Sequence, residues 1–87
     1  MTVTYRLVIK PSAAKEMERL DDQVLRRIDA AILRLRESPQ PQGSKKLTGV
    51  PLYRIRVGSY RVVYEIDERR KQVTVVTICH RREVYRR

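Results

Sequence analysis

LYRIRVGSYRVVYEI, residues 52–66, has the pattern of two strands joined at a single glycine, Gly58. Apolar side chains alternate with arginine on both sides of this glycine, which is typical of strands with one buried face. If the two strands pair across the glycine, Arg54, Arg56 and Arg61 lie on one face, opposite the apolar side chains. The stretch therefore predicts a β-hairpin with three guanidinium groups on its solvent face.

The flanking regions extend this hairpin into an α+β fold. Residues 2–9 alternate at period two and residues 73–80 are rich in β-branched side chains, so both are predicted strands. Apolar stripes at helical spacing predict two helices, over residues 10–20 and 21–38. We expect a single domain over residues 1–87: an antiparallel β-sheet with an N-terminal strand, a helical hairpin packed on one face, and a C-terminal three-strand meander.

Charge is the strongest compositional signal. The 87-residue chain has 20 Lys and Arg against 10 Asp and Glu, which gives a net charge of +10. Residues 45–87 hold twelve of the basic residues and only four of the acidic ones. A polyanion or an acidic protein is the expected partner, and the C-terminal half is where a phosphate backbone is expected to bind.

Cysteine and hydropathy patterns exclude several classes of protein. The one cysteine, Cys79, rules out an intramolecular disulfide framework, and with one histidine no zinc-binding spacing can be built. We expect no metal and no cofactor. The sequence shows neither a membrane-spanning apolar run nor a signal-peptide pattern, so a reducing, cytoplasmic location without membrane association is expected.

The three arginines have two interpretations that spacing alone leaves open. Arginines on the wet face of a sheet are commonly just solvated, with their stems covering apolar surface. Like charges on neighbouring strands also repel, at a cost of about 0.2 to 1 kcal/mol per close pair. Binding or catalysis on a phosphate is the functional reason to keep such a cluster.

Three blocks of the sequence resemble the RelE/ParE toxin superfamily of bacterial and archaeal toxin-antitoxin systems, and more particularly its RelE-like branch. They occur in the same order as in that family, and the order of predicted elements agrees along the full chain. The blocks are Leu47-x-Gly49, then Arg54-Ile55-Arg56 with Gly58-x-Tyr60-Arg61-Val62-Val63-Tyr64, and finally His80-Arg81 with Val84-Tyr85.

The resemblance implies a ribosome-dependent endoribonuclease that cuts messenger RNA in the ribosomal A site and inhibits translation. Positions that match the catalytic side chains of the family are Arg54, Arg56, Arg61, Arg81 and Tyr85. The further RNA-binding candidates are Lys45, Lys46, His80 and Arg82. Many relatives have lysine where this chain has Arg54 and Arg56, and arginine stays charged, so these two are expected to stabilise charge rather than transfer protons.

The expected reaction is metal-independent attack of a ribose 2′-hydroxyl on the adjacent phosphate. Preorganised cations that meet the developing negative charge are commonly the largest catalytic contribution, and Arg61 is the first candidate for it. A proton must also be removed; Tyr85 is the candidate base if guanidinium groups lower its pKa, and His80 is the alternative. Both side chains also have plain structural interpretations as packing, stacking or exposed residues.

Two other functions fit the same architecture. One is a ParE-like toxin that inhibits DNA gyrase without nuclease activity, and the other is a non-catalytic nucleic-acid-binding module. The resemblance implies a cognate, RelB-like antitoxin as partner, besides the ribosome and messenger RNA, and the net charge of +10 predicts that this antitoxin is acidic. Contact with operator DNA is expected only through the antitoxin complex.

Overall fold

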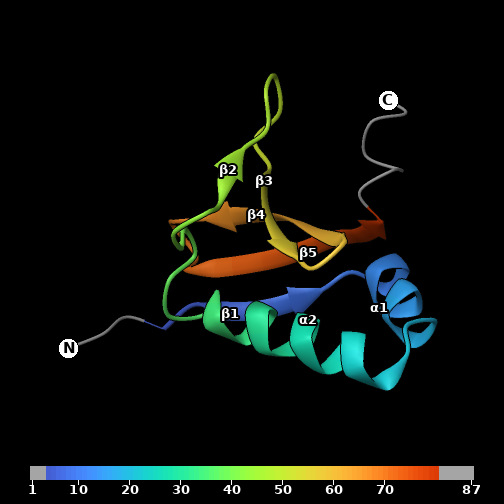
Figure 1. The fold of residues 1–87 in the computed structure, drawn as a ribbon. Coiled ribbons are helices and arrows are strands. Elements are labelled where there is room, and N and C mark those ends of the chain that lie inside the picture. Colours follow the sequence, from blue (N-terminus) through green and yellow to red (C-terminus); the bar gives the residue numbers. More distant parts are fainter. Residues whose placement is uncertain (1–3, 81–87) are drawn as a thin grey trace.

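The computed structural model describes residues 4–80, and in this range the chain forms five strands and two helices (Figure 1). The elements are β1 (Arg6–Ile9), α1 (Pro11–Glu18), α2 (Asp22–Arg34), β2 (Lys45–Lys46), β3 (Tyr53–Val57), β4 (Tyr60–Asp67) and β5 (Gln72–His80). The predicted α+β fold class is confirmed, with an N-terminal strand, two helices and a C-terminal meander of β3, β4 and β5.

The strands form one sheet in the order β1-β5-β4-β3-β2. The meander is antiparallel as expected, but β1 pairs in parallel with β5, with Leu7 opposite Val73. The sheet is therefore mixed rather than wholly antiparallel. Parallel neighbours need a long connection, and both helices and the rest of the meander lie between β1 and β5 in the chain, so this pairing is sterically possible.

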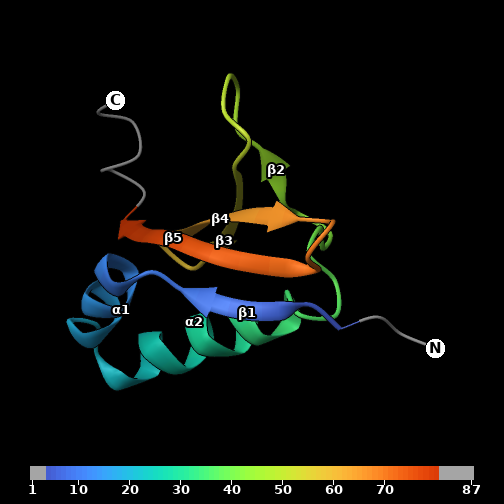
Figure 2. The ribbon, with the colours of Figure 1, turned by 180° about the vertical axis from the view of Figure 1, so that it is seen from behind.

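Local sequence signals account for the starts of both helices. Pro11 occupies the start of α1, where its missing N–H group costs nothing. The side chain of Asp21 caps α2 by accepting a hydrogen bond from the Val24 backbone N–H at 3.0 Å. Both helices lie on the same side of the sheet (Figure 2). Within residues 4–80, neither helix is long and apolar enough to cross a membrane.

The core lies between the helices and one face of the sheet. Ile28 and Ile32 of α2 are fully buried there, as the predicted apolar stripe requires. They belong to the same apolar cluster as Ile55, Val62 and Ile78, which lie opposite one another on β3, β4 and β5. Because side chains alternate across a strand, the arginines of β3 and β4 point away from this core.

The turn between β3 and β4 fixes which residues face each other. Gly58 has a φ of 61°, a conformation that glycine adopts without strain, and it follows β3 directly. Val57 pairs with Tyr60 across this turn. The pairing across Gly58 that the sequence predicts is therefore confirmed, and it sets the register of the whole hairpin.

Candidate nucleic-acid interface

Three arginines share the face of the sheet that points away from the helices. Arg56 of β3 is the direct pairing partner of Arg61 of β4, and Arg54 lies two residues from Arg56 along the same strand. Directly opposed residues in an antiparallel pair project to the same face, and so do residues two apart in one strand. We call these three residues the arginine cluster, and their common face the arginine face.

The members of the arginine cluster differ sharply in exposure. Arg56 is exposed and Arg54 is half-buried, whereas Arg61 keeps only 3% of its surface accessible. The expectation that Arg61 projects into solvent is therefore wrong. Arg61 lies on β4, with β3 on one side and β5 on the other, and Val63 on the same face is buried too. The middle of the arginine face is thus shielded from water, and a charge there acts through a lower dielectric than a surface charge does.

The two lysines before the hairpin lie on opposite faces. They form the short strand β2, in which Lys45 pairs with Arg54 and Lys46 pairs with Tyr53. Lys45 therefore extends the arginine face, while Lys46 projects to the side of the apolar cluster. A two-residue strand leaves almost no pattern in a sequence, so only the pairing with β3 separates these neighbours.

His80 does not lie on the arginine face. It pairs with Tyr60 at the end of β5, and the two rings meet edge to face with their centroids 5.4 Å apart. Its neighbour Cys79, whose side chain is half-buried, pairs with Arg61 and shares the arginine face. The register thus separates the imidazole of His80 from the three guanidinium groups that it was expected to assist.

Arg81, Arg82 and Tyr85 lie outside the described residues, so their predicted roles stay predictions. In the sequence these residues follow His80, which is the last residue of β5. Cys79, the residue before His80, pairs with Arg61. Among residues 4–80, His, Cys, Asp and Glu side chains form no group of three or more that could hold a metal ion.

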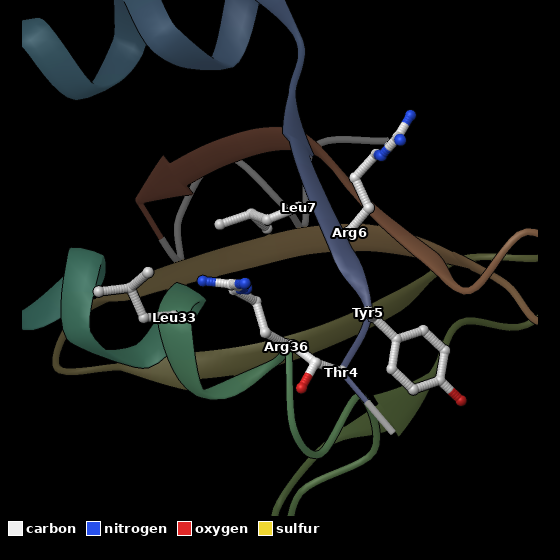
Figure 3. Close-up of a pocket in the computed structure, with 6 residues that line it drawn as sticks. All are labelled: Thr4, Tyr5, Arg6, Leu7, Leu33 and Arg36. Atoms are coloured by element: carbon white, nitrogen blue, oxygen red, sulfur yellow. The ribbon is translucent and has the colours of Figure 1, made fainter. Parts of the chain in front are cut away.

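A hollow of about 470 Å³ lies at the opposite edge of the sheet, along β1. Figure 3 shows its lining from β1, the residues before it and the C-terminal end of α2. The lining residues are Thr4, Tyr5, Arg6, Leu7, Leu33 and Arg36. Leu33 is an unusually exposed leucine, with half of its surface accessible. Figure 3 shows the Arg36 side chain between Leu7 and Leu33, while Arg6 points to the other side of β1.

Most of the chain matches one known protein family. The family described as the ParE toxin of the type II toxin-antitoxin system parDE matches residues 7–85. The chain belongs to this toxin family. Its predicted membership of the RelE/ParE superfamily is therefore confirmed.

Solved structures of RelE toxins are similar to this chain over nearly its full length. An archaeal RelE–RelB complex from Pyrococcus horikoshii OT3 is 30% identical, with a TM-score of 0.81 and coverage of 90% of this chain and 96% of the other. A free RelE toxin variant from E. coli is also 30% identical, with a TM-score of 0.78 and coverage of 95% and 92%.

A third structure supports the fold alone. The RelBE2 toxin-antitoxin complex from Mycobacterium tuberculosis is 22% identical, with a TM-score of 0.82 and coverage of 92% of this chain and 94% of the other. A search of curated proteins finds no match. The chain is thus a type II toxin whose family match is to ParE and whose similar structures include RelE toxins.

Proposed function

We propose that this toxin is a ribosome-dependent endoribonuclease that cuts messenger RNA in the ribosomal A site. The arginine cluster carries the proposal, because Arg56 and Arg61 pair directly across β3 and β4 and Arg54 lies on the same face. The 30% identical RelE structures and the net charge of +10 support it as well.

The three arginines are assigned different roles because their side chains differ in exposure to solvent. Exposed Arg56 and half-buried Arg54 can reach a phosphate that approaches from solvent, and a guanidinium fork matches two phosphate oxygens at once. Arg61, shielded from water, can stabilise the charge that builds up when the ribose 2′-oxygen attacks the phosphate. In this mechanism the 2′-hydroxyl loses its proton to a base as its oxygen forms a bond to phosphorus. The bond to the 5′-oxygen breaks and this oxygen takes up a proton, so a cyclic phosphate and a 5′-hydroxyl result.

Proton transfer is assigned to the segment after β5. Arginine cannot act as a base, because its guanidinium stays protonated at any working pH. His80 pairs with Tyr60 on the other face, so the register does not support it in this role. We therefore propose Tyr85 as the general base and Arg81 as a further cation, with Arg82 as an RNA contact.

A ParE-like inhibitor of DNA gyrase is the second candidate, since the family that matches residues 7–85 is described as the ParE toxin. This function needs a binding surface for gyrase and no chemistry at a phosphate. The two candidates differ in what the arginine cluster does, because a nuclease requires Arg61 for the chemical step and a gyrase inhibitor does not.

We propose an acidic, RelB-like antitoxin as the partner, in keeping with the RelB complex of the Pyrococcus horikoshii toxin. The hollow along β1 fits such a partner, because exposed Leu33 can pack against an apolar side chain while Arg36 beside it pairs with a carboxylate. Operator DNA is then contacted through the antitoxin in the complex. We place the free toxin in the cytoplasm, where ribosomes and messenger RNA are available.

Incubation of the purified toxin with ribosomes programmed with a defined messenger RNA tests the proposal. The nuclease is expected to cut within the A-site codon, to leave naked RNA largely uncut, and to leave gyrase supercoiling unchanged. Inhibited supercoiling together with intact messenger RNA contradicts the nuclease and favours the gyrase inhibitor. Binding to ribosomes without either effect favours a non-catalytic module.

A further inference from the structure

Within residues 4–80, the last part of β5 has no strand on one of its sides. β1 pairs with residues 72–75 only, and the Lys10 N–H group donates to the Val75 carbonyl at 3.0 Å where this pairing ends. β5 continues to His80, with β4 on one side and α1 near the other (Figures 1 and 2). The backbone N–H and C=O groups on the open side of an edge strand need hydrogen-bond partners. This stretch of β5 therefore depends on hydrogen-bonding groups from α1.

Glu16 of α1 supplies that partner. Its Oε1 atom accepts a hydrogen bond from the Ile78 backbone N–H at 2.9 Å and another from the Thr77 hydroxyl at 2.9 Å. Its Oε2 atom accepts from the same hydroxyl at 3.1 Å. A carboxylate on a helix thus takes the place of a neighbouring strand's carbonyl. Hydrogen bonds to an ionised acceptor are about twice as strong as neutral ones, and here they are partly shielded from water.

The contact falls at an irregular point of β5. The pairing with β4 shifts between Val63 and Tyr64, which leaves one extra residue, Val76, in β5. Such bulges bend the strand and interrupt its hydrogen-bond ladder, so the residues that follow are held less firmly by β4 alone. Glu16 binds Thr77 and Ile78, the two residues directly after the irregularity.

This segment of β5 also holds the arginine cluster in register. Ile78 is opposite Val62, and the next residue, Cys79, is opposite Arg61. Arg61 in turn is opposite Arg56 on β3. A shift in β5 after the irregularity therefore moves the backbone against which Arg61 is packed, although Glu16 itself touches none of the arginines through a hydrogen bond or ion pair described for residues 4–80.

We infer that Glu16 is a positioning residue, which clamps α1 to the bulged half of β5 and thereby holds Arg61 in the geometry needed for the chemical step. The inference rests on the proposed nuclease function. Misplacing a catalytic group by about 1 Å costs roughly 100-fold in rate, while a surface that binds a polyanion by its summed charge tolerates such a shift. Loss of the clamp is therefore expected to lower kcat and to leave KM nearly unchanged.

Four single variants of the toxin, assayed on programmed ribosomes, test the clamp. Glu16→Ala is expected to lower kcat by about 10- to 100-fold. Glu16→Gln keeps an amide oxygen that can accept from Ile78, so it is expected to recover most of that loss. Glu18→Ala removes the same charge from an exposed position of the same helix and is expected to behave as the wild type. Thr77→Val, which removes only the hydroxyl donor, is expected to show a smaller loss than Glu16→Ala.

Amide hydrogen exchange provides a readout that does not depend on cleavage. The Ile78 amide is expected to exchange faster in Glu16→Ala than in Glu18→Ala, while the amides of α2 stay protected. An active Glu16→Ala toxin with wild-type kcat, or an Ile78 amide with unchanged exchange, overturns the clamp alone. A wild-type toxin that cuts no messenger RNA on ribosomes instead overturns the proposed function, so the two failures are told apart.

Discussion

Arg56 and Arg61 are direct partners across β3 and β4, yet one is exposed and the other keeps only 3% of its surface accessible. The pair places one guanidinium in water and one in a shielded environment on the same face of the sheet. An exposed arginine is suited to capture a phosphate, and a buried one is suited to meet charge as it develops, since it needs no reorganisation at that moment. In the proposed nuclease, this pairing links the sheet register to a division of roles.

Lys45 and Lys46 provide a test of which face binds RNA. Lys45 pairs with Arg54 on the arginine face, and Lys46 pairs with Tyr53 on the other. Lys45→Ala is expected to weaken ribosome binding and to reduce the slope of log affinity against log salt by about 1, as loss of one phosphate contact does. Lys46→Ala, the matched control, is expected to leave the slope unchanged. Equal effects of the two substitutions contradict an arginine-face interface.

Leu33 provides a test of the hollow along β1. Leu33→Asp replaces an exposed apolar side chain with a carboxylate in the hollow that is proposed to bind an acidic antitoxin, so affinity for the antitoxin is expected to fall at least about tenfold. Calorimetry on the purified partners measures this. Val50→Asp changes another exposed apolar residue, located in the β2–β3 connection, and is the control. Undiminished affinity in Leu33→Asp places the antitoxin elsewhere.

Tyr64 is expected to make stability depend on pH in the alkaline range. Burial of the phenol raises its pKa from 10.0 to about 12, and its hydroxyl donates to the Pro39 carbonyl at 2.6 Å. The folded state favours the protonated phenol, so this contribution is complete below pH 10 and is lost as the pH rises through about 12.

Denaturant unfolding of the wild type and of Tyr64→Phe on both sides of this pH window measures the effect. The substitution is expected to cost about 1 kcal/mol at neutral pH, because the hydrogen bond to Pro39 is lost. The difference between the two proteins is expected to shrink as the pH rises through the window. A difference that does not change with pH would show that Tyr64 ionises equally easily in both states.

Much of the fold could be predicted from local pattern. The alternation in residues 52–66 assigned Arg54, Arg56 and Arg61 to one face, because a strand has a fixed period and Gly58 marks the only turn within the stretch. The apolar stripe of α2 was equally predictable, since Ile28 and Ile32 recur at helical spacing. In both cases the information lies within a few neighbouring residues.

Features that depend on distant contacts could not be predicted in this way. The parallel pairing of β1 with β5 depends on which strand lies beside Leu7, and no local pattern records that. The burial of Arg61 depends on packing over the arginine face, and the separation of Lys45 from Lys46 depends on pairing with β3. Glu16 looks like an ordinary polar residue of a short helix, and its proposed role rests on contacts with Thr77 and Ile78, 61 and 62 positions away.

The rate of messenger RNA cleavage on programmed ribosomes by Arg61→Ala tests the central claim most directly. The control is Arg26→Ala, which removes the same charge from an exposed position of α2, and retained antitoxin binding shows that both variants fold. Arg61→Ala is expected to cut about 100- to 1,000-fold more slowly than the wild type, while Arg26→Ala cuts at the wild-type rate. Wild-type cleavage by Arg61→Ala, or an equal loss in Arg26→Ala, contradicts catalysis by the arginine cluster.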